Sequence, residues 1–137
     1  METFFSILEV LGVTPEQFFS QQPLEQKIVY NEEESTLYYD EEHGYELKWL
    51  IPASNEKEME PVIITFDKNG EYKTFEPSLS ETFIYVIDGS IRLILGEATY
   101  IAKKGQTMYY QATEPHQISN NGRGKSRALI VATESYL

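Results

Sequence analysis

Cysteine is absent from this 137-residue chain, and its absence excludes several kinds of site. Without thiols there is no disulfide framework, no thiolate metal site and no cysteine nucleophile. Long apolar runs are lacking too: the longest are far short of the ~20 residues that a membrane span needs. The first eleven residues have neither a basic flank nor a small-residue cleavage site, so we expect no secretory signal. We therefore expect a cytoplasmic protein without membrane contact.

Basic residues are scarce in one part of the chain. Residues 1–60 hold 14 acidic residues against three basic ones, whereas residues 61–137 hold eight of each, so the net charge of −11 arises entirely in the first part. Binding to DNA needs Lys and Arg to displace counterions, so we do not expect this chain alone to bind nucleic acid. Two interpretations of the acidic excess stay open: a solvated face, or a site for a cation or basic partner.

The composition fits one packed domain, with 41% apolar and 13% aromatic residues. The first twenty residues carry a helical pattern. Apolar residues recur there at three- and four-residue spacing, Gly12 fits a C-terminal cap, and Thr14-Pro15 fits the start of a second helix. The apolar residues of the first predicted helix are Phe4, Phe5, Ile7, Leu8 and Leu11. We predict two short helices over residues 1–20, followed by a linker at 21–26.

The remaining residues, 27–137, show runs of β-branched and aromatic residues separated by turn signals. Many short strands at regular spacing predict an antiparallel sandwich or barrel. Asp88-Gly89 between two apolar runs predicts a hairpin, and the polar stretch 51–61 predicts an exposed loop. The predicted strands are Lys27–Tyr30, Thr36–Tyr39, Tyr45–Ile51, Val62–Asp67, Phe83–Asp88, Ile91–Leu95, Thr107–Gln111 and Ser126–Thr133.

Residues 82–120 carry an ordered set of motifs. Thr82 to Gly89 is followed by the run Ile91–Leu95, by Lys104-Gly105, and by Glu114-Pro115-His116 with Asn120 four residues further on. This order resembles the two motifs of the cupin superfamily. The resemblance implies a mainly β fold, the cupin double-stranded β-helix or jelly-roll barrel, here preceded by the two short helices.

The first helices have a resemblance of their own. The run from Phe5 to Phe19 is similar to the last helices of a lambda-repressor-like helix-turn-helix domain of the XRE family, which many bacterial regulators join to a C-terminal cupin by a linker of this length. The resemblance implies that the helices reading DNA lie upstream of Met1 and are absent from this chain. The alternative is a helical cap on the barrel.

The metal positions of the cupin motifs are mostly replaced. Counting back from Gly89 places Thr82 where the family has Glu, and Glu76 and Ser78 where it has two His; the longer spacing would place Phe75 and Pro77 there instead. Only His116 matches a ligand position. We predict no bound transition metal and no cofactor, with a weak site of Glu76, Glu81 and His116 as the alternative.

The same positions suggest a small-molecule pocket. Strand alternation from Thr82 turns Ile84 and Val86 inwards and Tyr85 outwards, and it puts Met108 and Tyr110 on one face. Core packing is the alternative role for the tyrosines, and a Glu76–His116 pair around water is the alternative for the cavity. A carboxylate at Glu76 would favour a cationic or hydroxyl-bearing ligand. The candidate pocket residues are Glu76, Ser78, Thr82, Ile84, Met108, Tyr110 and His116.

Three functions remain as hypotheses. The first is a ligand-sensing and dimerisation domain of a bacterial helix-turn-helix regulator, acting as a homodimer that binds an unknown small-molecule effector. The second is a stand-alone cupin enzyme of isomerase or dioxygenase type, acting on a small sugar or acid. The third is a dimerisation scaffold that binds no ligand.

Overall fold

The computed structural model describes residues 27–134 and Leu137, which form nine strands and two short 3-10 turns. Every pairing among these strands is antiparallel. The expectation of a mainly β fold with antiparallel sheets is confirmed. In chain order the elements are η1 (Glu32–Glu34), β1 (Thr36–Asp40), β2 (Tyr45–Trp49), η2 (Ser54–Glu56), β3 (Met59–Phe66), β4 (Glu81–Asp88), β5 (Ser90–Leu95), β6 (Ala98–Lys103), β7 (Thr107–Gln111), β8 (His116–Asn120) and β9 (Ser126–Thr133).

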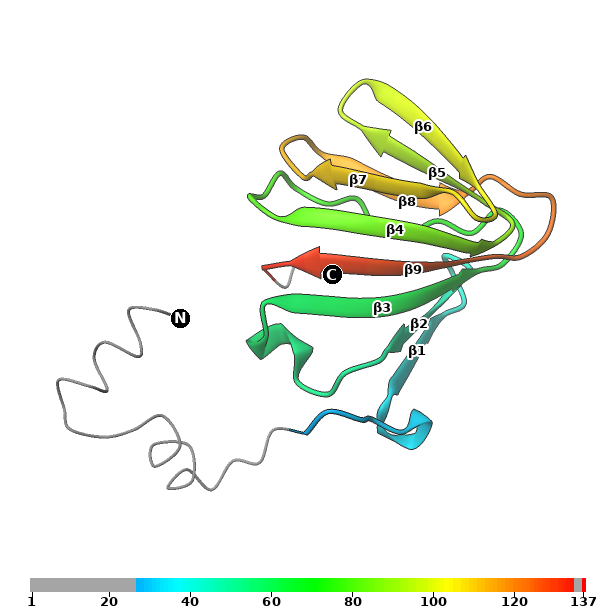
Figure 1. The fold of residues 1–137 in the computed structure, drawn as a ribbon. Helices are drawn as coiled ribbons and strands as arrows, with labels where there is room; N and C mark the ends of the chain where they lie inside the picture. Colours follow the sequence, from blue (N-terminus) through cyan, green and yellow to red (C-terminus); the bar gives the residue numbers. More distant parts are fainter. Residues whose placement is uncertain (1–26, 135–136) are drawn as a thin grey trace, which may run out of the picture.

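The strands make two sheets of unequal size. The larger sheet has the order β1-β2-β3-β9-β4-β7, and the smaller has the order β6-β5-β8. Figure 1 shows the last strand, β9, in the middle of the larger sheet, between β3 and β4. β9 thereby joins the first three strands to β4 and β7. The edges β7 and β6 belong to different sheets, and the cavity described below lies between them.

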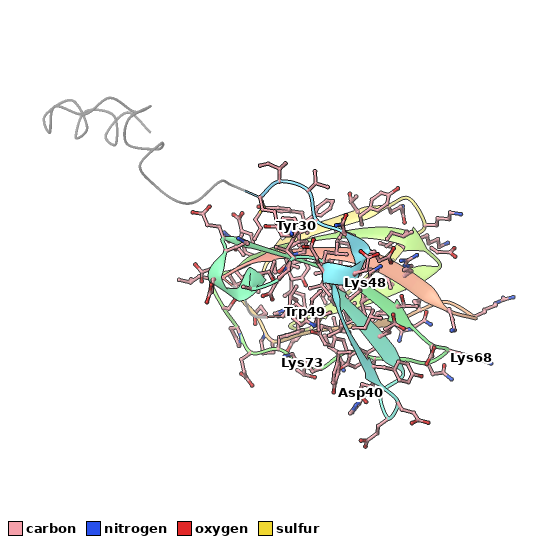
Figure 2. The ribbon with its side chains drawn as sticks, turned by 90° about the horizontal axis from the view of Figure 1, so that it is seen from below. Tyr30, Asp40, Lys48, Trp49, Lys68 and Lys73 are labelled. Atoms are coloured by element: carbon pink, nitrogen blue, oxygen red, sulfur yellow. The ribbon has the colours of Figure 1, made fainter. Side chains whose placement is uncertain are left out.

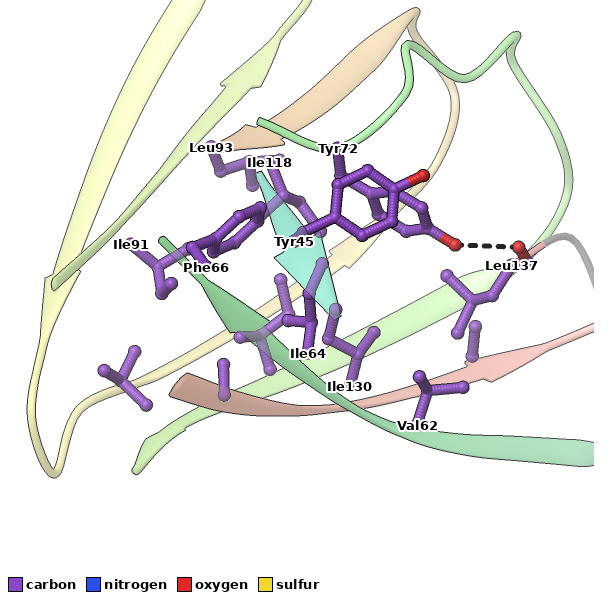
Figure 3. Packing of buried hydrophobic residues seen from close by; sticks show 14 of the residues in the cluster. Tyr45, Val62, Ile64, Phe66, Tyr72, Ile91, Leu93, Ile118, Ile130 and Leu137 are labelled. Carbon is purple, nitrogen blue, oxygen red and sulfur yellow. Dashed lines mark hydrogen bonds between the residues drawn. The ribbon is translucent and has the colours of Figure 1, made fainter. Parts of the chain in front are cut away.

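The core lies between the two sheets because alternate residues of each strand point inwards. On β3 the side chains of Val62, Ile64 and Phe66 are buried, while the residues between them are partly exposed. Figure 3 shows Ile64 from the larger sheet facing Leu93 and Ile118 from the smaller one. Each fully buried aliphatic side chain contributes about 1.5–3 kcal/mol relative to an exposed one, so this layer supplies most of the drive to fold.

Asp88 and Gly89 do not form the predicted hairpin. β4 pairs with β7 and β9, whereas β5 pairs with β6 and β8, so the turn carries the chain from one sheet to the other. Gly89 has φ +77°, and a Cβ there would clash with the Ser126 hydroxyl oxygen. The dipeptide correctly marks a tight turn, but a turn signal alone does not determine which strands pair.

The strand predictions differ from the structure in three further places. Lys27–Tyr30 is described but is not a strand, and it makes no sheet pairing. β6 and β8 were not predicted. β8 has the sequence His-Gln-Ile-Ser-Asn, which is too polar to be predicted as a buried strand. Four of its five residues are nevertheless buried. The side chains of His116, Gln117 and Asn120 make hydrogen bonds to neighbouring segments, which residue hydrophobicity does not reveal.

The stretch 51–61 is only partly the exposed loop that its polarity predicts. Glu56, Lys57 and Glu58 are exposed, as expected. β3, however, begins at Met59, and Glu60 is the second residue of that strand, with 3% of its surface exposed. Glu60 continues the inward alternation of β3, and for this reason its side chain is buried.

The predicted helices of residues 1–20 and the linker 21–26 lie outside the described residues. Residues 27–137 were predicted as one β domain, and both sheets fall in this range. None of the helical segments in the described part of the chain has the length and apolar character of a membrane span.

Candidate ligand-binding site

A cavity of about 280 Å³ lies between the open edges of the two sheets. None of the described residues that line it is charged. β5 contributes Leu93 and Leu95, β6 contributes Tyr100, and β7 contributes its three consecutive residues 108–110. This is an apolar hollow with phenolic groups on its wall, which suits a small organic molecule better than an ion.

The sheet register places the lining side chains. On β7, Met108 pairs with Ile84 and Tyr110 pairs with Thr82, so these four side chains lie on the inner face of the larger sheet. Ile84 and Thr82 are fully buried behind the cavity. Met108 is partly buried, and Tyr110 is 8% exposed. The structure therefore brings four of the seven predicted residues together, two on the cavity wall and two beneath them.

The opposite wall comes from the smaller sheet. Leu93 pairs with Tyr100 across β5 and β6, so the two side chains share the face turned towards β7. Leu93, Leu95 and Tyr100 were not among the predicted pocket residues. β6 was not predicted as a strand, so no sequence pattern placed Tyr100 beside Leu93.

His116 lies next to this cavity, in the layer behind Tyr110. It is 1% exposed, its ring stacks on Phe75 with 5.1 Å between centroids, and Tyr110 meets it edge-on at 5.6 Å. Its Nδ1 lies 3.0 Å from the Glu114 carbonyl oxygen, which fixes the proton on Nδ1. Burial lowers the pKa of His116, which the bond to Glu114 only partly opposes. The imidazole is therefore neutral at neutral pH, and it supports the cavity wall through its edge-on contact with Tyr110.

Two predicted residues do not belong to this site. Glu76 is exposed and is not among the residues that line the cavity, so the lining does not supply the carboxylate on which the expected cationic ligand depends. Ser78 is only partly buried; its hydroxyl accepts a hydrogen bond from the Ser80 backbone N–H. The inward residue is Phe75, whose backbone pairs with that of His116. The longer spacing of the first motif therefore accounts for the buried Phe75, but its second position, Pro77, is exposed.

The donor set near His116 does not fit a first-row metal. Phe75 covers one face of the imidazole with a phenyl ring, and Thr82 occupies the position of the family's Glu. Glu81 faces the other way, and its carboxylate accepts a hydrogen bond from the Tyr109 hydroxyl on the outer side of the sheet. Among the described residues there is no group of three His, Asp or Glu that converges on one point. One imidazole among apolar rings holds such an ion poorly.

Fold and site together define a class: small two-sheet jelly rolls with a ligand-sized apolar hollow at the mouth between the sheets. A comparison with family models then gives the family. The cupin domain model matches residues 63–132, and the chain belongs to the cupin family.

Solved structures agree on the fold. The cupin domain of Schizosaccharomyces pombe Cnp3 has a TM-score of 0.62 at 13% identity and covers 77% of this chain and 73% of its own. An HTH_3 family transcriptional regulator from Vibrio cholerae has a TM-score of 0.61 at 16% identity and covers 96% of this chain and 70% of its own. KdgF from Halomonas has a TM-score of 0.62 at 14% identity, covering 80% and 94%. A comparison with curated proteins gives no match.

Proposed function

We propose that this chain is the ligand-sensing and dimerisation part of a bacterial helix-turn-helix regulator. The observation that carries the proposal is the uncharged cavity between β7 and the smaller sheet, which has the size and lining of a small-molecule site. The likeness to the Vibrio cholerae regulator supports it, because that alignment covers 96% of the chain and so extends beyond residues 63–132, which match the cupin model. The DNA-reading helices would lie upstream, outside this chain.

The chemistry of the cavity indicates its ligand. Leucine, methionine and tyrosine side chains line it, and the charged Glu76 is turned to solvent. A charged ligand would lose its hydration here without gaining a counter-charge. The effector is therefore a small, uncharged, mainly apolar molecule, with tyrosine hydroxyls on the wall to orient one polar group.

Ligand binding is tested by thermal shift with a panel of small uncharged aromatic and aliphatic compounds, using indole, phenol and cyclohexanol as first probes. Met108→Phe adds volume inside the cavity and is expected to weaken binding by about tenfold or more. Thr107→Phe adds the same ring on the exposed neighbouring position and is the matched control. If no probe stabilises the protein, or if both variants behave alike, the cavity is not a ligand site.

The regulator role is tested separately. The coding sequence upstream of Met1 is expected to encode a basic helical region, and a protein that includes it is expected to bind duplex DNA as a two-fold dimer. The present chain alone is expected to form a homodimer in sedimentation and not to bind DNA, since its net charge is −11. Tight, salt-sensitive DNA binding by the chain alone would contradict this assignment.

A stand-alone cupin enzyme is the second candidate. The likeness to KdgF and the position of His116 beside the cavity favour it. An enzyme that used His116 for proton transfer would lose turnover in His116→Ala while still binding its substrate. Elemental analysis of the purified protein adds an independent test: stoichiometric zinc, nickel, iron or manganese that disappears in His116→Ala would support the enzyme and contradict the donor-set argument above.

A further inference from the structure

A second cavity, of about 350 Å³, lies towards the β1 edge of the larger sheet, beside the start of β1, the end of β2 and the start of β3. The loop 51–54, which precedes β3, closes one side of it. Its lining combines a carboxylate, two hydroxyl groups and an indole, contributed by Glu60, Ser54, Thr36 and Trp49. None of these residues belongs to the cavity between β7 and the smaller sheet, so the two sites are separate.

Glu60 gives this second cavity its chemical character. It is 3% exposed, a degree of burial that is rare for a carboxylate. The Ser54 hydroxyl donates a hydrogen bond to the Glu60 carboxylate, with 3.4 Å between Oγ and Oε2. A carboxylate has about four acceptor positions, so it can accept hydrogen bonds from several donors at once, including those of a ligand. A carboxyl group at a cavity wall suits a ligand that donates hydrogen bonds, and a charged donor makes the strongest of them.

Trp49 adds a second preference for a cation. It is the last residue of β2 and pairs with Val62, so its side chain lies on the inner face of the sheet with Glu60. Figure 2 shows Trp49 towards the end of β2 away from the hairpin tip, which Asp40 marks. The face of an indole attracts cations more strongly than any other aromatic side chain. Carboxylate and indole together favour an organic cation.

The remaining lining narrows the class of ligand. Ile51, Pro52, Ala53 and Leu137 complete the lining with apolar side chains, which suit a hydrocarbon substituent. A metal ion is a poor fit, because the described side chains of the lining offer one carboxylate and two hydroxyls, fewer than the six to eight oxygen ligands of calcium or the octahedral set of magnesium. No lysine or arginine lines the cavity among the described residues, and all but one of the residues that form it belong to the acidic first part of the chain.

We propose that this cavity binds the ammonium group of a small primary alkylamine. The Glu60 carboxylate accepts hydrogen bonds from the ammonium, the hydroxyls of Ser54 and Thr36 supply further acceptors, and Trp49 covers the adjoining carbon. The apolar side chains of the lining then hold the short alkyl chain. The site is independent of the proposed regulator role, since it uses a different cavity and a ligand of opposite character.

The chain carries its own reporter for the test, because Trp49 is its only tryptophan. Titration of the full chain with n-butylammonium chloride is expected to give a saturable change in tryptophan fluorescence. 1-Butanol and butyrate, added at the same concentrations, are expected to give none. Glu60→Gln keeps the shape but removes the charge and is expected to weaken binding by about tenfold or more. Glu58→Gln, an exposed neighbour, is expected to bind as the unmodified chain does.

Thr36→Val provides a second variant in case Glu60→Gln does not fold. It removes one acceptor at the rim of the cavity and is expected to weaken binding several-fold.

A lysine side chain from another protein carries the same ammonium group, so Nα-acetyl-lysine methylamide is titrated in parallel. Weaker binding of this bulkier probe assigns the site to a free amine, as proposed, and tighter binding overturns that assignment. An equal response to 1-butanol, or no saturable response to n-butylammonium, overturns the site itself.

Discussion

Asn120 connects two loops and the first residue of β9 through a single side chain. Its amide nitrogen donates to the carbonyl oxygens of Asp67 and Gly124, at 2.8 and 2.7 Å. Its amide oxygen accepts from the Gly122 N–H and from the Ser126 hydroxyl, each at 2.7 Å. The side chain is almost fully buried, and all of its hydrogen-bonding capacity is used. Its position after His116, singled out by the motif, therefore has a structural role.

Asn120→Ala is expected to lower the free energy of unfolding by about 2–4 kcal/mol, because this buried side chain loses four hydrogen bonds at once. Urea unfolding followed by circular dichroism measures the change. Gln111→Ala, at an exposed position of β7, is the control and is expected to change stability by about 0.5 kcal/mol or less. Equal stability of the two variants would show that the loops hold without Asn120.

His116 is expected to make stability depend on pH in a defined window. Its pKa is lowered in the folded protein by burial, so below the ordinary value of 6.5 the unfolded chain takes up a proton that the folded protein resists. The stability contributed by neutral His116 is complete above about pH 6.5 and decreases as the pH falls towards the lowered pKa. His116→Gln is expected to show a smaller decrease between about pH 6.5 and 5 in urea unfolding.

The pKa of the second histidine, His43, is shifted in the opposite direction, so its effect on stability has the opposite dependence on pH. The neighbouring Asp40 carboxylate raises the pKa of His43, with 2.8 Å between Oδ2 and Nδ1. The stability gained from this pair is present below about pH 6.5 and is lost as the pH rises through the raised pKa. Both proteins in the comparison keep His43, so its contribution cancels. An unchanged slope in His116→Gln would contradict the assignment to His116.

Among the structural elements, the corner between β4 and β5 depends on Gly89. Gly89→Ala places a methyl group against Ser126 at a positive φ, and both effects are unfavourable. We expect a loss of about 2–5 kcal/mol in the free energy of unfolding, measured by thermal and urea denaturation. A Cβ on Gly124 would have no described atom within 4 Å, so Gly124→Ala is the control, expected to change stability by about 1 kcal/mol or less. If Gly89→Ala and Gly124→Ala lowered the free energy of unfolding equally, the corner between β4 and β5 would not depend on Gly89.

The strands that the sequence predicts well are those with an alternating or continuous apolar pattern. β7 and β9 coincide with the predicted Thr107–Gln111 and Ser126–Thr133. Such patterns indicate which face is buried, since side chains alternate along a strand. They do not indicate which strands are neighbours, and for this reason the turn at Gly89 cannot be told from a hairpin by its sequence.

The part of the candidate site that lies on β4 and β7 could be predicted from the sequence, and the part before β4 could not. Alternation from Thr82 correctly turns Ile84 inwards, and Met108 and Tyr110 face the same interior through β7. The segment before β4 contains isolated bridges and no long strand, so it has no alternation to fix its register. Counting residues there selects Glu76, one position away from the buried Phe75. Glu60 escapes prediction because its polar neighbours in the sequence resemble a loop.

Across the entire domain, β9 connects the two halves of the larger sheet by pairing with both of them, and we expect the sheet to unfold as one unit. It pairs with β3 over eight residues and with β4 on its other side. Ile130, fully buried near its centre, contacts both halves through these pairings. Ile130→Ala is expected to cost about 2–5 kcal/mol and to shift the unfolding curves from Trp49 fluorescence and from circular dichroism equally. Separate transitions for the two probes would mean that the halves unfold independently.

The central place of β9 also bears on how the chain is made. A ribosome releases β1 to β8 before β9, and until β9 has emerged the larger sheet has no strand between β3 and β4. The register that unites the halves joins Met59 to Thr133, a contact across most of the domain, and such distant pairings form slowly. During synthesis β3 and β4 therefore each expose an unpaired edge, and the nascent chain is most open to edge-to-edge association just before its last strand appears.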